Sequence, residues 1–281
     1  MKLLLTLPTP LDYFASLVQS DAEFPLLEAA VSLAQDDYPE LDVQQVLGSV
    51  DQLLARLKRR VAADAPPLQK LRAVNQFFYR DLGFAGNLNH YHDPDNSYIS
   101  VILQTRRAIP ITLAVVWLEL AQGVGLTARG VGFPGHFMVK VNLPNGQVVI
   151  DPLDGQSLSR EELTERLAPF QRRSGLIDES EVPLGLYLQV TPARDIIARM
   201  LRNLKEIHTN QEDWARLIAV QDRLTVLLPK TWSEYRDRGL AHAELGQLDR
   251  ALADLDMYLS MAKTEPDMAA IAGRVAELRR T

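Results

Sequence analysis

Apolar residues recur at helical spacing through the first part of the chain, from residue 11 to about residue 85. Four groups show the three- and four-residue spacing of a helix that buries one face. They are Leu11, Phe14, Leu17 and Val18; Leu26, Leu27, Ala30 and Leu33; Val46, Val50, Leu53, Leu54 and Leu57; and Leu68, Leu71, Val74, Phe77 and Phe78. Asp42 suits the N-cap of the third helix, and Pro66-Pro67 separates it from the fourth. These stripes predict a helical core without chemistry of its own.

The pattern changes at Gly86. Residues 87–97 are polar and rich in turn formers, which predicts a loop. The run from Ala108 to Ala128 is apolar on nearly all sides, with Glu119 as its one charged residue. Pro110 suits the first turn of a helix, whereas Gly123 and Gly125 mark the end of one. The pattern therefore predicts a helix buried at the centre of a domain.

Three β-rich runs follow the apolar helix. They cover residues 128–133, 136–141 and 147–151, and Pro144-Asn145-Gly146 is a hairpin signal between the last two. We expect an antiparallel meander, so that the class of this region is α+β.

Residues 183–281 return to helical spacing and contain an internal repeat. The units are about 194–229 and 231–266, each ending near a proline. The second unit follows the tetratricopeptide pattern, in which small residues allow two antiparallel helices to approach closely. The residues that fit this pattern are Tyr235, Gly239, Ala243, Gly246, Ala251 and Pro266.

Composition narrows the functional classes. The 281 residues contain 47% hydrophobic and 23% charged residues, values typical of globular domains, and the formal charge is −6. That charge disfavours direct nucleic-acid binding. The apolar opening, residues 1–7, is too short for a signal-peptide core, and no run is long enough for a membrane helix, so we expect a soluble, cytoplasmic protein without membrane contact. The lack of cysteine excludes every thiolate mechanism.

The strongest candidate for chemistry is a pair formed by His136 and Asp151. His136 follows Gly135 at the start of one predicted strand, and Asp151 ends the next. A carboxylate beside an imidazole fixes its tautomer and stabilises its protonated form. If the hairpin is centred near Leu143-Pro144, the two residues lie opposite each other, and a slip of one residue would separate them.

The loop before the apolar helix holds a second candidate group. His90 and His92 could bind a divalent metal or contribute to the mouth of a pocket beside His136, although alternating residues on a loop have no fixed geometry. Side-chain hydrogen bonds within the turn explain the same residues without a metal. We therefore predict no metal or cofactor, and we expect Asn96 and Ser97 to order the loop.

The run from Asn96 to Gly155 resembles the bacterial SirB-type proteins. The residues that carry the resemblance are Asn96-Ser97-Tyr98, Arg106 to Leu113, Gly125-Leu126, Gly130 to Phe137, Ile150-Asp151-Pro152 and Asp154-Gly155. The family implies a transglutaminase-like domain, with a papain-like core, followed by tetratricopeptide helices. It implies a domain over residues 1–182, helical to 85 with a core helix and strands over 86–155, and a repeat tail over 183–281.

The same resemblance places a nucleophile at the start of the buried helix, with His136 and Asp151 as its partners. The position where this family carries cysteine falls at about Pro110, and Thr112 bears the one hydroxyl in that turn. A secondary alcohol is a poor substitute for a thiolate. We therefore predict a non-catalytic, regulatory protein that binds a protein or peptide through its tail.

Two alternatives remain. One is acyl transfer or amide hydrolysis by Thr112 or by a water activated by His136, which requires the Thr112 hydroxyl within reach of the imidazole. The other is metal-assisted hydrolysis, which requires His90, His92 and His136 to converge. The family name points to control of gene expression, which we do not expect to involve direct DNA contact.

Overall fold

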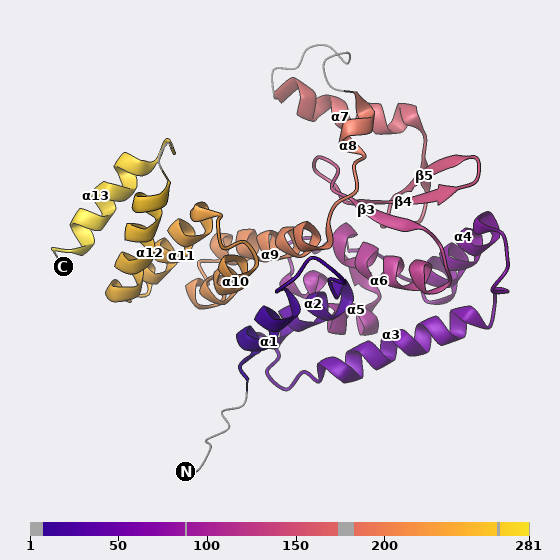
Figure 1. Ribbon diagram of the computed structural model, residues 1–281, viewed down its shortest axis with the longest axis horizontal. Coiled ribbons are helices and arrows are strands. Elements are labelled where there is room, and N and C mark those ends of the chain that lie inside the picture. The colour runs from indigo at the N-terminus through magenta and orange to yellow at the C-terminus, as the bar shows by residue number, and fades with distance from the viewer. Residues whose placement is uncertain (1–7, 88, 174–182, 263–264, 281) are drawn as a thin grey trace, which may run out of the picture. The chain divides into compact units, whose positions relative to one another are not determined.

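The computed structural model describes residues 8–87, 89–173, 183–262 and 265–280 (Figure 1). The opening segment 1–7 and the end of the predicted first domain, residues 174–182, lie outside the described residues. Contacts divide the chain into two compact units. Unit 1 holds residues 1–24, 35–40 and 198–281, and unit 2 holds residues 25–34 and 41–197. The predicted mixed class of helices and strands is confirmed.

Unit 2 contains the sheet and the helices around it. Its helices are α2 (Leu26–Ser32), α3 (Val43–Lys58), α4 (Pro67–Asn75), the π-helical turn η2 (Gln76–Asp81), the 3-10 turn η3 (Pro94–Ser97), α5 (Ile99–Thr105), α6 (Pro110–Gly123), α7 (Arg160–Arg173) and α8 (Leu184–Tyr187). Its strands are β1 (Ala85–Gly86), β2 (Arg107–Ala108), β3 (Ala128–Val131), β4 (Met138–Leu143), β5 (Gly146–Ile150) and β6 (Ser157–Leu158). Strands β1 and β2 form a short parallel pair, and β3 to β6 form an antiparallel sheet in chain order.

The hairpin between β4 and β5 differs from its predicted position. Leu143 pairs with Gly146, so the two-residue turn is centred between Pro144 and Asn145, not between Leu143 and Pro144. Gly146 takes up the positive φ of 138° that this tight connection requires. The strand predicted from residue 136 begins at Met138, because His136 ends a turn in which its N–H donates to the Phe133 carbonyl.

Helix α6 packs against the sheet as the apolar pattern predicts. It starts at Pro110 and ends at Gly123, and its side chains from Ile111 to Leu118 are all buried. Helix α7 packs on the sheet through Leu163 and Leu167, which contact Val131, Phe133, Met138 and Val149. The hydrophobic pattern does not predict α5, because it is short, or α7, because it is strongly charged.

Unit 1 contains the predicted repeats. Its helices are α1 (Pro10–Leu17), α9 (Ala193–Asn210), which the division crosses after residue 197, α10 (Trp214–Leu227), α11 (Trp232–Glu244), α12 (Leu248–Met261) and α13 (Met268–Leu278). A Cβ atom on Gly239 of α11 would lie 2.8 Å from Leu255 of α12, so the close approach of these helices requires glycine. The small residues of the pattern therefore act as predicted.

Helix α1, from the other end of the chain, packs against α10 in the same unit. Arg223 of α10 is buried, and its guanidinium donates to Asp36 at 2.8 Å and lies 5.2 Å from the Phe14 ring. These contacts join residues nearly 190 positions apart.

Candidate functional site

His136 and Asp151 lie in contact in unit 2. The His136 Nε2 atom is 2.9 Å from Asp151 Oδ1. The β4–β5 ladder pairs Val139 with Ile150, so its continuation sets Met138 opposite Asp151. The two side chains therefore meet although His136 lies two residues before that position, in the turn that precedes β4.

Two glycines shape the turns that carry this pair. Gly135 has a φ of 67°, and a Cβ atom there would lie 2.1 Å from the Phe170 ring of α7. Gly155 has a φ of 78°, and its Cβ atom would lie 2.3 Å from the Tyr79 ring. Both the left-handed backbone and the close approach exclude larger residues at these positions.

Arg166 of α7 completes the surroundings of the carboxylate. Its Nη1 atom donates to Asp151 Oδ2 at 2.7 Å, and the Leu153 N–H donates to Oδ1 at 3.0 Å. Burial opposes the charge of Asp151, but the hydrogen bonds from His136, Arg166 and Leu153 outweigh it and lower the pKa of Asp151 to about 2. Asp151 is therefore ionised at neutral pH, and it can orient the imidazole and stabilise an imidazolium.

A chain of hydrogen bonds connects the Asp151 turn to helix α6. Trp117 Nε1 donates to Asn75 Oδ1 at 3.0 Å, and Asn75 Nδ2 donates to the Gly155 carbonyl at 3.2 Å. The Tyr79 hydroxyl donates to the Pro152 carbonyl at 3.2 Å. Burial and the charges of nearby aspartates raise the pKa of Tyr79, so the phenol stays neutral. Arg166, Tyr79 and Asn75 were missed in the sequence, because no local pattern marks a residue that supports a distant turn.

Thr112 forms no hydrogen bond with the imidazole. Its side chain is fully buried in α6, and its Oγ1 atom has no hydrogen-bond partner among the described residues. Pro110, where the resemblance expects the nucleophile, is the first residue of α6 and is also buried. The hydrogen bond to His136 that the Thr112 alternative requires is therefore not formed.

Asn96 organises the loop before α5. Its Nδ2 atom donates to the His90 carbonyl at 2.6 Å, and its Oδ1 atom accepts from Asn87 at 2.9 Å. Ser97 is buried as well, and its Oγ atom has no hydrogen-bond partner among the described residues. Thus Asn96 orders the loop as expected, whereas the hydroxyl of Ser97 does not.

His90 and His92 lie exposed on this loop. Within the part of the chain that the structure describes, no three histidine, aspartate or glutamate side chains form a group that could hold a metal ion. The convergence of His90, His92 and His136 that the metal alternative required is therefore wrong.

A cavity of about 510 Å³ lies beside the Asp151 turn. Its lining includes Leu71, Asn75, Tyr79, Ile150, Asp154 and Gly155, but neither His136 nor Asp151. The hydrogen-bond chain from Trp117 thus forms part of one wall of this cavity.

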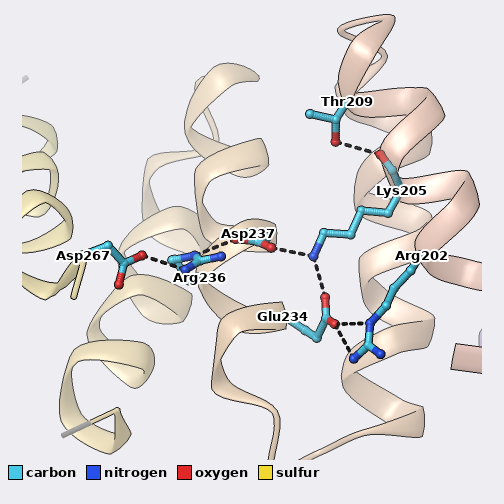
Figure 2. A network of polar contacts seen from close by, with 7 residues as sticks. All are labelled: Arg202, Lys205, Thr209, Glu234, Arg236, Asp237 and Asp267. Carbon is cyan, nitrogen blue, oxygen red and sulfur yellow. Dashed lines mark hydrogen bonds and ion pairs between the residues drawn. The ribbon is translucent and has the colours of Figure 1, made fainter. Parts of the chain in front are cut away.

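The repeat helices carry a separate network of charges in unit 1. Figure 2 shows Lys205 of α9 between two carboxylates of α11, with Nζ 2.6 Å from Glu234 Oε2 and 2.5 Å from Asp237 Oδ2. Arg202 donates to Glu234 at 3.1 Å, and Arg236 connects Asp237 to Asp267. The side chain of Glu234 is 3% exposed, whereas that of Arg202 is 50% exposed. The network therefore extends from the helix contact to the surface.

Two family models match the chain. Residues 44–202 match the transglutaminase-like superfamily, and residues 204–276 match the tetratricopeptide repeat. The first match covers more than half of the chain, so this protein belongs to the transglutaminase-like superfamily and carries a carboxy-terminal tetratricopeptide region.

Its curated relatives define a narrower family. A UPF0162 protein of Xylella fastidiosa (strain Temecula1) is 35% identical over 92% of this chain and 91% of its own length. The UPF0162 protein YchA of Escherichia coli (strain K12) is 25% identical over 88% of this chain and 91% of its own. Among solved structures, menin, described with the binding site for the Mixed Lineage Leukemia protein, matches with a TM-score of 0.43 and 11% identity over 90% of this chain and 69% of menin.

No helix of the described residues combines the length and apolar character needed to cross a membrane.

Proposed function

We propose that this protein is a non-catalytic member of the transglutaminase-like superfamily that binds a protein or peptide partner through its repeat helices. The proposal assigns residues 1–182 to the transglutaminase-like part and residues 183–281 to the binding tail. Tetratricopeptide repeats generally mediate protein–protein interaction, and residues 204–276 of this chain match them.

The observation that carries the proposal is the lack of an available nucleophile at the start of α6. Pro110 offers no nucleophilic atom, and the Thr112 hydroxyl is buried without a hydrogen bond to His136. A carboxylate–imidazole pair without a nucleophile beside it cannot form an acyl intermediate. His136 and Asp151 then serve as structure or as a polar contact for a bound ligand.

The partner face that we propose includes the exposed side of α9 and α11. Arg202 and Arg236 present guanidinium groups there, and each is held by a carboxylate. Side chains held in this way lose little entropy when a partner covers them. A peptide with carbonyl or carboxylate acceptors fits the remaining N–H donors of these arginines.

The experiment compares two matched arginine variants of the full chain. Arg202→Gln removes one of the two cationic partners of Glu234, and Arg279→Gln removes a partner of Asp256; the two arginine side chains are 50% and 58% exposed. The tagged wild-type chain is used to isolate its partner from its own cells, and the purified pair is then measured by titration calorimetry. We expect Arg202→Gln to weaken binding about tenfold and Arg279→Gln to leave it within twofold. Equal effects of both variants, with unchanged melting temperatures, would refute this face.

The resemblance to SirB-type proteins supports a regulatory setting for this binding. The net charge of −6 favours an effect through a protein partner over direct contact with DNA.

A second candidate function is hydrolysis by a water molecule that His136 activates. One observation favours it: the His136 side chain is 18% exposed, and Asp151 is placed to stabilise its protonated form. This candidate predicts turnover that depends on His136, whereas the first predicts none.

A further inference from the structure

A second cavity in unit 2, of about 470 Å³, lies between α3 and α5. Its charged lining residues are Arg56 of α3 and Arg106, which follows α5, and none of the described acidic residues lines it. The uncharged polar lining residues are Gln45, Ser49, Gln52, Ser100 and Gln104. Nearby Asp42 accepts the Gln45 N–H as the cap of α3. This cavity therefore concentrates positive charge and hydrogen-bond donors.

Arg106 is held in a demanding backbone conformation. Its φ of 61° lies in the left-handed region, which costs a residue with a side chain more than it costs glycine. The Arg106 N–H donates to the Ile102 carbonyl at 2.9 Å, and its own carbonyl accepts from the Ala85 N–H at 3.0 Å. The fold thus fixes the backbone position of Arg106, which lines the cavity.

The guanidinium of Arg106 has a donor that the described residues leave unused. Its Cζ atom lies 4.7 Å from the centre of the buried Phe84 ring, and its Nη1 atom is buried without a hydrogen-bond partner among the described residues. Burial, followed by the positive charge of Arg56, lowers the pKa of Arg106. A buried, unpaired donor beside a like charge is unfavourable until an anion supplies the acceptor.

Arg56, like Arg106, has no carboxylate partner among the described residues. Its Cζ atom lies 5.6 Å from the Phe77 ring, and no carboxylate of the described residues forms an ion pair with it or with Arg106. Arg60, which lies two residues beyond the end of α3, is instead paired with Asp81. Asp81 therefore neutralises Arg60, whereas the charges of Arg56 and Arg106 have no carboxylate partner among the described residues.

We propose that this cavity binds the phosphate group of a small phosphomonoester between Arg56 and Arg106. Two guanidinium groups match the dianionic charge of a phosphomonoester better than the single charge of a carboxylate, and both offer paired N–H donors. The apolar part of the lining, Val46, Leu53 and Leu103, suits the uncharged remainder of such a ligand. The volume lies within the range of small-molecule sites.

Titration calorimetry on the full chain tests this site with phenyl phosphate, inorganic phosphate and benzoate, at constant ionic strength set by chloride. We expect phenyl phosphate to bind at one site, and benzoate to bind about tenfold more weakly because it carries one charge. If benzoate binds as tightly as phenyl phosphate, the assignment to phosphate is wrong. If none of the three anions binds, the site itself is wrong.

Variants locate the binding. Arg56→Gln and Arg106→Gln should each weaken phenyl phosphate binding about tenfold or more, whereas Arg59→Gln, which removes the same charge from an exposed residue outside the lining, should change it less than twofold. An equal loss in Arg59→Gln would show non-specific attraction and overturn the proposal.

Ser100→Asp provides a test that does not depend on removing an arginine. An aspartate in the first turn of α5 would supply the missing negative charge to the cavity, and it suits the start of a helix. We expect this variant to melt at a higher temperature and to lose phenyl phosphate binding. Binding that persists at the wild-type affinity would contradict the proposed position of the phosphate.

Discussion

Asp151 in unit 2 and Glu234 in unit 1 are buried carboxylates that each accept from two side chains, yet their surroundings differ. Asp151 binds one arginine and one imidazole, and the imidazole is partly exposed. Glu234 binds Arg202 and Lys205 of α9, so its charge ties one repeat helix to another. The first arrangement orients a partly exposed ring, whereas the second connects two repeat helices.

The largest expected effect comes from removing Glu234. The variant Glu234→Ala removes the carboxylate that Arg202 contacts and leaves Lys205 with Asp237 alone. Because Glu234 itself is buried whereas Arg202 is half exposed, the loss should lie at the lower end of the range for a buried pair, about 3 kcal/mol. The control Asp256→Ala breaks the exposed pair with Arg279 and should cost less than about 1 kcal/mol. Urea unfolding followed by circular dichroism measures both, and similar losses would show that Glu234 does not hold the repeat helices together.

Gly135→Ala tests the turn that carries His136. The left-handed backbone and the contact with Phe170 together should cost about 3 kcal/mol. Gly48, in the middle of α3, has no atom within 4 Å of an added Cβ, so Gly48→Ala should instead stabilise the chain by about 1 kcal/mol. Thermal unfolding compares the two variants, and a neutral Gly135→Ala would show that this turn tolerates other residues.

Asp151 should make the free energy of unfolding of the wild-type protein depend on pH in the acidic range. Its pKa is about 2 in the folded chain against an ordinary value of 3.8, so its contribution is complete above about pH 4 and is lost as the pH falls through 2. The difference corresponds to about 2 kcal/mol. The free energy of unfolding should fall by this amount more in the wild type than in Asp151→Asn between pH 4.5 and pH 2. Parallel curves for the two proteins would contradict the low pKa.

A smaller effect is expected from Arg166→Gln. The Arg166 side chain is 43% exposed, so its loss should cost less than about 1 kcal/mol at neutral pH. Its hydrogen bond lowers the pKa of Asp151, so the variant should lose stability at a higher pH than the wild type during acid titration. An unchanged titration would assign the low pKa to His136 and the Leu153 N–H alone.

Local patterns predicted much of the fold. The Asp42 cap, the limits of α6 and the helices of the second repeat follow from hydrophobic spacing and from proline and glycine positions. The register of the hairpin was displaced because the turn residues Pro144-Asn145-Gly146 allow more than one centre. Helix α7 was not predicted because most of its residues are charged or polar, and the role of Arg166, which lies on this helix, was therefore not predicted either.

Contacts between residues far apart in the chain could not be predicted, because local sequence patterns report only on neighbouring residues. Helix α1 and Asp36 meet Arg223 in one unit, although nothing in the local sequence of either segment marks the other. The cavity of Arg56 and Arg106 likewise involves α3 and α5, which are separated in the chain by α4, η2, β1 and η3, and no local pattern marks either arginine as part of a site. The pair His136 and Asp151 was accessible because a single hairpin connects its two residues.

The central claim, that the carboxylate–imidazole pair lacks a nucleophile and does not turn over substrate, is tested most directly by ammonia release. The purified wild-type chain and His136→Ala are incubated with a glutamine-containing peptide and with a primary amine, and free ammonia is measured over time. The account predicts the same background rate for both proteins, with or without the amine. A wild-type rate that exceeds the background and disappears in His136→Ala would contradict it.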